Sequence, residues 1–133
     1  MLGLHDLQHI VILKVASVKR SREFYAKKMG LNVIVRGGKD YDRHKNRPQI
    51  CLDQLGSPSK YTPRKVCPGS SEIHFFSKRT IEELEHILLG QQIPIISKDK
   101  FNTDDQGEQE CIYLHDPDGN LLRIIGCPNP AGI

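Results

Sequence analysis

The pattern of apolar and polar residues predicts the same order of strands and helix in each half of the chain. In the first half, residues 7–15 form an apolar run rich in β-branched side chains, which is typical of a strand. Residues 17–30 begin with a serine that can cap a helix and end with a glycine that can close one. We therefore predict a helix there, followed by strands at 31–38 and 48–55 and a weaker strand between them at 41–46.

The second half repeats this order around a stronger helix signal. Thr80 and Glu83, three residues further on, form a capping box that begins an amphipathic segment. Apolar runs on both sides of this segment predict strands, and a polar stretch between two of them predicts a loop. The predicted elements are a strand at 71–77, a helix at 80–90, a strand at 93–97, a polar loop at 98–109 and a hairpin of strands at 111–115 and 121–126.

A segment rich in proline, glycine and serine separates the two halves. Residues 56–69 have the composition of a linker without regular structure. We therefore predict an α+β fold of two βαβββ modules, at about 5–55 and 70–127, within one domain of 133 residues. What repeats is the order of the predicted elements and not the sequence itself, because sequence identity between the halves is low.

Charge and cysteine content narrow the classes of function. The net charge is +3, and the basic residues are scattered among acids, which argues against a nucleic-acid partner. No apolar stretch approaches the ~20 residues of a membrane span, and the first residues do not resemble a secretory signal. We expect a cytoplasmic protein with reduced thiols and no structural zinc site, because no two cysteines form a C-x-x-C pair. The cysteines are Cys51, Cys67, Cys111 and Cys127.

The end of the chain combines a strong turn signal with an unexpected charge. Asp116, Pro117 and Gly119 occupy positions that suit a type I turn between two strands. Arg123 then interrupts the apolar run of the last strand. A charge inside a strand that otherwise has a core composition requires a partner or exposure to solvent.

Segments from both ends of the chain together resemble the glyoxalase/bleomycin-resistance/extradiol-dioxygenase group, the vicinal oxygen chelate superfamily. They are HIVI at 9–12, FY at 24–25, MGLNV at 29–33 and YLHDPDGN at 113–120. The resemblance covers nearly the whole chain. It implies a cup-shaped mixed sheet made by the two modules and completed in a homodimer. It also implies a divalent metal (Fe, Mn, Ni or Zn) that binds adjacent oxygens of a small molecule, a Lewis-acid site.

The resemblance points to three metal ligands. His9 occupies the first-strand ligand position of one module, and Glu72 occupies the corresponding position of the other. His74 shares a strand face with Glu72, so a shift of register would exchange their roles. Structural alternatives stay open: His9 as a core or dimer-contact histidine, Glu72 paired with a basic neighbour, and His74 packed under the helix.

Arg123 stands where the superfamily has its most regular ligand, a glutamate. A guanidinium has no free lone pair and adds positive charge, so the standard metal site is broken in this sequence. Three interpretations remain open: an ion pair with Glu72, bidentate binding of a ligand carboxylate or phosphate, or a side chain in solvent at a strand edge. In an enzyme, Glu72 and Arg123 would be the candidate catalytic residues.

Two further residues are candidates for binding a substrate together with Arg123. Tyr113 can donate its hydroxyl to a ligand or pack against the sheet. Asp53 shares a strand face with Cys51 at or beside the fourth-strand ligand position of the superfamily, although an aspartate near a strand end is more often exposed.

These features leave two functions open. One is an enzyme that acts on a small oxygenated, anionic molecule, with a metal if one binds. The other is a metal-free protein that sequesters a small molecule, as in the bleomycin-resistance branch of the superfamily.

Overall fold

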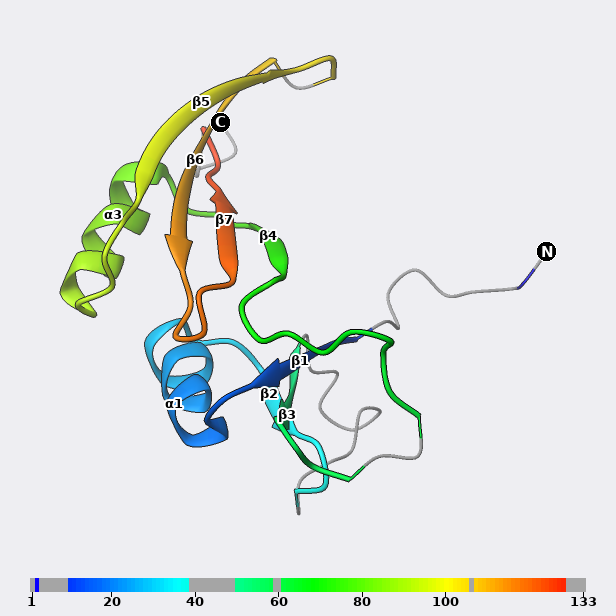
Figure 1. The fold of residues 1–133 in the computed structure, drawn as a ribbon. Helices are drawn as coiled ribbons and strands as arrows, with labels where there is room; N and C mark the ends of the chain where they lie inside the picture. The colour runs from blue at the N-terminus through cyan, green and yellow to red at the C-terminus, as the bar shows by residue number, and fades with distance from the viewer. Residues whose placement is uncertain (1, 3–9, 39–49, 59–60, 106, 129–133) are drawn as a thin grey trace. The chain divides into compact units, whose positions relative to one another are not determined.

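Two separate sheets, one in each half of the chain, organise the structure (Figure 1). The computed structural model describes residues 2, 10–38, 50–58, 61–105 and 107–128. The chain divides between Pro68 and Gly69 into two compact units. Among the described residues, no helix is long and apolar enough to cross a membrane.

The first unit contains a sheet of three parallel strands. The strands are β1 (Val11–Val15), β2 (Val33–Val35) and β3 (Ile50–Gln54), in the order β1-β3-β2. A helical segment between β1 and β2 comprises α1 (Val18–Arg22) and η1 (Glu23–Lys28). The predicted strands at 7–15, 31–38 and 48–55 are therefore present in shorter form, and the predicted strand at 41–46 lies outside the described residues.

The helical segment of the first unit begins as predicted and then changes its geometry. The side-chain oxygen of Ser17 caps it by accepting a hydrogen bond from the backbone N–H of Arg20. From Glu23 the segment is a π-helix, in which the Met29 N–H donates to the Phe24 carbonyl five residues earlier. Gly30 follows in the left-handed conformation, with φ of 73°.

The second unit has the full βαβββ order. Its strands are β4 (Glu72–Phe76), β5 (Ser97–Thr103), β6 (Gly107–His115) and β7 (Leu121–Ile125), with α3 (Ile81–Gly90) between β4 and β5. The strand order is β4-β7-β6-β5, in which β4 and β7 are parallel and the other two pairs are antiparallel. With helices and sheets in both units, the predicted α+β class is confirmed.

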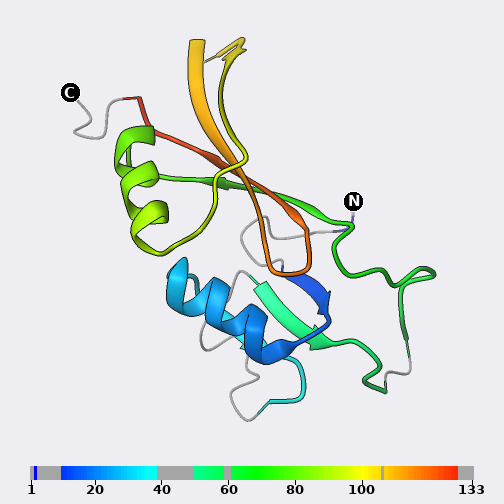
Figure 2. The same ribbon diagram turned by 60° about the vertical axis from the view of Figure 1, so that its left-hand side comes forward.

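Helix α3 covers one face of the second sheet (Figure 2). The predicted capping box is present, because Thr80 and Glu83 each bond the backbone of the other. The helix buries Ile81, Leu84 and Leu88, and the strands bury an apolar set on the side that faces it. In the described part of this unit, no helix lies on the opposite face. The buried strand residues are Ile112, Leu114, Leu122 and Ile124.

The region between α3 and β6 differs from the sequence prediction. Of the predicted strand at 93–97, only Ser97 is in a strand, and most of the predicted loop at 98–109 belongs to β5 and β6. These two strands form a long antiparallel hairpin (Figure 1). Its strands are polar on both sides over much of their length, so they lack the apolar alternation by which a strand is recognised.

The turn between β6 and β7 is confirmed and fixes the start of the last strand. The Gly119 N–H donates to the Asp116 carbonyl at 3.0 Å, and the buried Asp116 carboxylate accepts from the backbone N–H and side-chain amide of Asn120. Gly69 packs against this turn with φ of 88°, and a Cβ there would lie 2.2 Å from the Asp118 carbonyl oxygen. The turn and the residues before β4 thus hold β7 in place.

Candidate functional site

The face of the second sheet opposite α3, here called the open face, gathers most of the residues singled out by the sequence. Strand pairing places Glu72 and His74 of β4 beside Leu121 and Arg123 of β7, on the side away from α3. Strand β7 lies between β4 and β6, so Arg123 is in the interior of the sheet. The remaining open-face positions used below are Phe76 on β4, Asp99 and Phe101 on β5, Cys111 and Tyr113 on β6, and Ile125 on β7.

Two aromatic side chains lie against the guanidinium of Arg123. Its guanidinium carbon lies 4.1 Å from the ring centroid of Phe101 and 5.7 Å from that of Tyr113, within the range of cation–π attraction. The Nε atom is buried and has no hydrogen-bond partner among the described residues. A hydrogen bond with Cys111 raises the pKa of Arg123 further above its usual range, although burial acts in the opposite direction. Arg123 is therefore a fixed positive charge with an unused donor.

The next question is whether a carboxylate of the described residues neutralises this charge. Among the described residues, no carboxylate oxygen lies within 4.0 Å of a guanidinium nitrogen of Arg123. Glu72 contributes only a small Coulombic increase to the pKa of Arg123. The predicted ion pair is therefore not formed, and the position on a central strand contradicts the alternative of a side chain in solvent at a strand edge. Bidentate binding of an anionic ligand stays a prediction.

Glu72 and His74 bond to each other instead of to Arg123. The distance from Oε2 of Glu72 to Nε2 of His74 is 2.6 Å, and the side chains are 55% and 40% exposed. The prediction that they share a strand face is confirmed. His74 is the residue of β4 paired with Arg123, so it does not pack under the helix. The site combines a guanidinium with a histidine that a carboxylate orients.

The described residues do not fit the three-ligand metal site that the resemblance implies. In the described part of the chain, no three His, Cys, Asp or Glu side chains are grouped so that they could hold a metal ion. On β4, Glu72 and His74 supply two donors, and the neighbouring strand position holds Arg123. A guanidinium beside a divalent ion is repulsive. His9, the third predicted ligand, lies outside the described residues.

Asp53 lies in the first unit and already has cationic partners. It is 3% exposed on β3, and its Oδ2 atom is 2.5 Å from Nζ of Lys14 and 3.4 Å from Nη1 of Arg36. The expectation that it is exposed was therefore wrong. Its proposed contact with a substrate stays a prediction, and its observed contacts are those of a buried ion-pair cluster.

Two residues of the site were missed by the sequence reasoning. Phe101 stacks on Arg123, but the polar sequence around it predicted a loop. It is the one aromatic residue in 98–109, which was the available signal. Cys111 bonds the guanidinium and lies two residues before Tyr113, so strand alternation places both on one face.

Comparison with known proteins gives similar curated proteins and similar solved structures. No protein-family model matches the sequence. The chain is 25% identical to the virulence protein STM3117 of Salmonella typhimurium over 118 residues. The aligned region covers 89% of this chain and 81% of that protein.

Two solved structures are similar to this chain over most of its length. A structure from the mobile metagenome of V. Pseudocholerae has a TM-score of 0.76 at 25% identity and covers 97% of this chain and 99% of that chain. A member of the glyoxalase/bleomycin resistance protein/dioxygenase superfamily from Sphaerobacter thermophilus has a TM-score of 0.60 at 20% identity and covers 90% of this chain and 95% of that chain. The resemblance seen in the sequence is thus confirmed at the level of the fold.

Proposed function

Because the chain has the fold of the glyoxalase/bleomycin resistance protein/dioxygenase superfamily, we propose that it binds a small anionic molecule on the open face, with Arg123 holding the anion. The observation that supports this most strongly is a charged guanidinium on a central strand, for which the described part of the chain supplies neither a nearby carboxylate nor an acceptor for the Nε–H group. The solved structures support the fold, and the contacts of Arg123 support the ligand.

A purely structural role would leave the unpaired Nε–H donor of Arg123 unexplained. A partly buried charge without a counter-ion is unfavourable, and an unsatisfied buried donor alone costs about 1–3 kcal/mol. An apolar residue would fill the same strand position without either cost. A carboxylate or phosphate oxygen would supply both the counter-charge and the acceptor, since a guanidinium binds such groups through paired N–H donors. The anion would first meet the terminal nitrogens, because Nε is enclosed in this conformation.

Anion binding of this kind does not need a metal ion. The guanidinium provides the positive charge that the metal supplies in the site implied by the resemblance. A divalent ion would need at least one ligand from outside Glu72 and His74. We therefore expect anion binding to be unchanged by a chelator, and a dependence on added Mn²⁺, Zn²⁺, Ni²⁺ or Fe²⁺ would contradict this part of the proposal.

The hydrogen bond between Glu72 and His74 favours a second candidate function, proton transfer to or from the bound molecule. A carboxylate that orients an imidazole is a common arrangement for general acid–base catalysis, and histidine exchanges protons near neutral pH. We would test this by following deuterium exchange at the methyl carbon of pyruvate, which lies next to its carbonyl group, in D₂O. Exchange that is accelerated by the protein and lost in His74→Gln would support catalysis, whereas equal exchange with both proteins would leave binding as the function.

The binding proposal can be tested by thermal unfolding with sodium acetate and sodium phosphate at constant ionic strength. A ligand at about 100 times its dissociation constant stabilises a protein by ~2.7 kcal/mol, which gives a clear rise in melting temperature. We expect a saturable rise in the wild type that is lost in Arg123→Gln. The matched control is Arg79→Gln, because Arg79 is 60% exposed and pairs with Glu83 away from the open face. A rise that persists in Arg123→Gln would contradict the proposal.

A further inference from the structure

The open face also indicates which kind of anion it accepts. We infer that the ligand is a monocarboxylate attached to an aromatic or similarly flat apolar group. This inference rests on the proposed function and adds the class of ligand to it. The charge balance of the face and its aromatic side chains support it independently.

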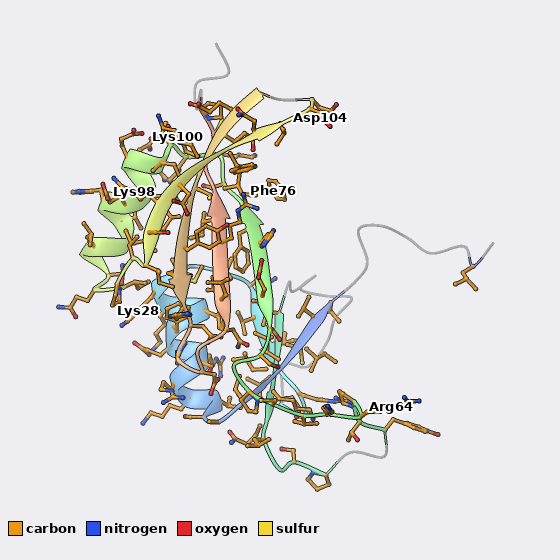
Figure 3. The ribbon with its side chains drawn as sticks, turned by 45° about the horizontal axis from the view of Figure 1, so that its top comes forward. Lys28, Arg64, Phe76, Lys98, Lys100 and Asp104 are labelled. Atoms are coloured by element: carbon orange, nitrogen blue, oxygen red, sulfur yellow. The ribbon has the colours of Figure 1, made fainter. Side chains whose placement is uncertain are left out.

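The charge balance of the open face favours a single negative charge on the ligand. Among the described strand positions of this face, Arg123 is the one permanent cation, and Glu72 and Asp99 are carboxylates. Lys98 and Lys100 alternate onto the other side of β5 (Figure 3), where Lys98 bonds a glutamate of α3 at 3.0 Å. One guanidinium matches one carboxylate, whereas the second charge of a phosphate dianion would be repelled by the neighbouring acids.

Apolar surface lies on the same face as this charge. The rings of Phe101 and Tyr113 flank the guanidinium. Phe76 is 81% exposed at the end of β4, which is unusual for so large an apolar side chain (Figure 3). It pairs with Ile125, two residues beyond Arg123 on β7. An exposed aromatic side chain beside a binding group is a favourable contact surface for an apolar ligand.

The register of β4 against β7 gives the offset between Arg123 and Phe76 along the strands. Strand residues rise by about 3.3 Å each, so the Cα atoms of Phe76 and Arg123 are displaced by roughly 7 Å along the strand direction. A carboxylate joined directly to one aromatic ring has about this length. Such a ligand could place its carboxylate on Arg123 and its ring on Phe76, whereas acetate would reach only the guanidinium.

The ligand class can be tested by isothermal titration calorimetry of the full chain with four probes: benzoate, acetate, phenyl phosphate and benzamide. Benzamide has the shape of benzoate without its charge, and acetate has the charge without the ring. We expect benzoate to bind at least about tenfold more tightly than acetate, because its ring removes apolar surface from water. We expect phenyl phosphate to bind more weakly than benzoate, and benzamide to give no measurable binding.

Two variants separate the ring contact from the charge contact. Phe76→Ala should reduce the preference for benzoate over acetate to within about threefold and leave the affinity for acetate unchanged. Leu89→Ala is the matched control, because Leu89 is 59% exposed on α3, and it should leave both affinities unchanged.

The outcomes distinguish this inference from the proposed function. If acetate or phenyl phosphate binds as tightly as benzoate, and Arg123→Gln abolishes that binding, the aromatic monocarboxylate is wrong and the anion site stands. An unchanged preference in Phe76→Ala would also overturn the inferred ring contact. If no anion binds, or if binding survives in Arg123→Gln, the proposed function itself fails.

Discussion

Replacing Arg123 by methionine should abolish anion binding with little effect on the stability of the fold. Methionine is similar in length, is apolar and suits a partly buried strand position beside aromatic rings. Removing one residue of a buried ion pair usually lowers the free energy of unfolding by about 3–5 kcal/mol, because the other charge is left buried and unpaired. Arg123 has no carboxylate partner within 4.0 Å among the described residues, so we expect a different result.

The expected magnitude follows from the contacts of the guanidinium. Substitution removes an unsatisfied buried donor, a gain of about 1–3 kcal/mol, and loses a hydrogen bond to Cys111 of about 0.5–1.5 kcal/mol. It also loses cation–π attraction of about 0.5–2 kcal/mol and gains sulfur–aromatic contacts of about 0.3–1.5 kcal/mol. The central values of these contributions nearly cancel, so we expect the free energy of unfolding to change by less than ~1 kcal/mol.

Urea denaturation followed by circular dichroism measures this change directly. The slope of the unfolding free energy against urea should be the same for the two proteins, so that the midpoint reports stability. A loss of about 3 kcal/mol or more in Arg123→Met would show that the guanidinium has a structural partner and would refute the reasoning. A small change together with the loss of the anion-induced rise in melting temperature would support a binding role.

Three further predictions concern the framework of each unit. Asp53→Asn should lower the free energy of unfolding by about 3 kcal/mol in urea denaturation, because it leaves two cations without their carboxylate; a loss below ~1 kcal/mol would contradict the buried ion-pair cluster. Gly69→Ala should destabilise by more than ~1 kcal/mol in the same assay, since its Cβ would collide with the Asp118 carbonyl, and an unchanged midpoint would argue against that contact. The backbone N–H of Thr80 lowers the pKa of Glu83 below its usual 4.5, so this carboxylate stabilises the fold above that pH and the contribution is lost as the pH falls through the lowered value. Acid titration of unfolding should therefore be shallower in Glu83→Gln below about pH 4.5, and identical curves would contradict the cap.

Local signals in the sequence predicted the elements that depend on near neighbours. The capping box of Thr80 and Glu83 and the turn at Asp116 each involve residues within four positions of one another, and both are present. The π-helical geometry near Phe24 was not predicted, because spacings of four and five residues are not distinguished by one short apolar pattern. Strand β5 was missed, since a hairpin with solvent on both sides does not need alternating apolar residues.

The sequence predicted only those features of the candidate site that follow from the alternation of side chains along a single strand. Alternation placed Glu72 and His74 on one face, and the hydrogen bond between them agrees. The pairing of His74 with Arg123 depends on the register of β4 against β7, and the stacking of Phe101 depends on the hairpin. Long-range registers of this kind are set by the whole sheet, and a sequence pattern does not specify them. The role of His9 stays a prediction.

The most direct test of the anion site is the side-chain Nε–H resonance of Arg123 during a titration with benzoate. The resonance can be assigned by its absence from the spectrum of Arg123→Met. We predict a saturable shift of this signal and slower exchange of its proton with water, while the Nε–H signal of Arg79 stays in place, because the bound carboxylate engages the guanidinium of Arg123. An Arg123 signal that is unchanged at benzoate concentrations that shift other resonances, or that moves no more than that of Arg79, would contradict the account.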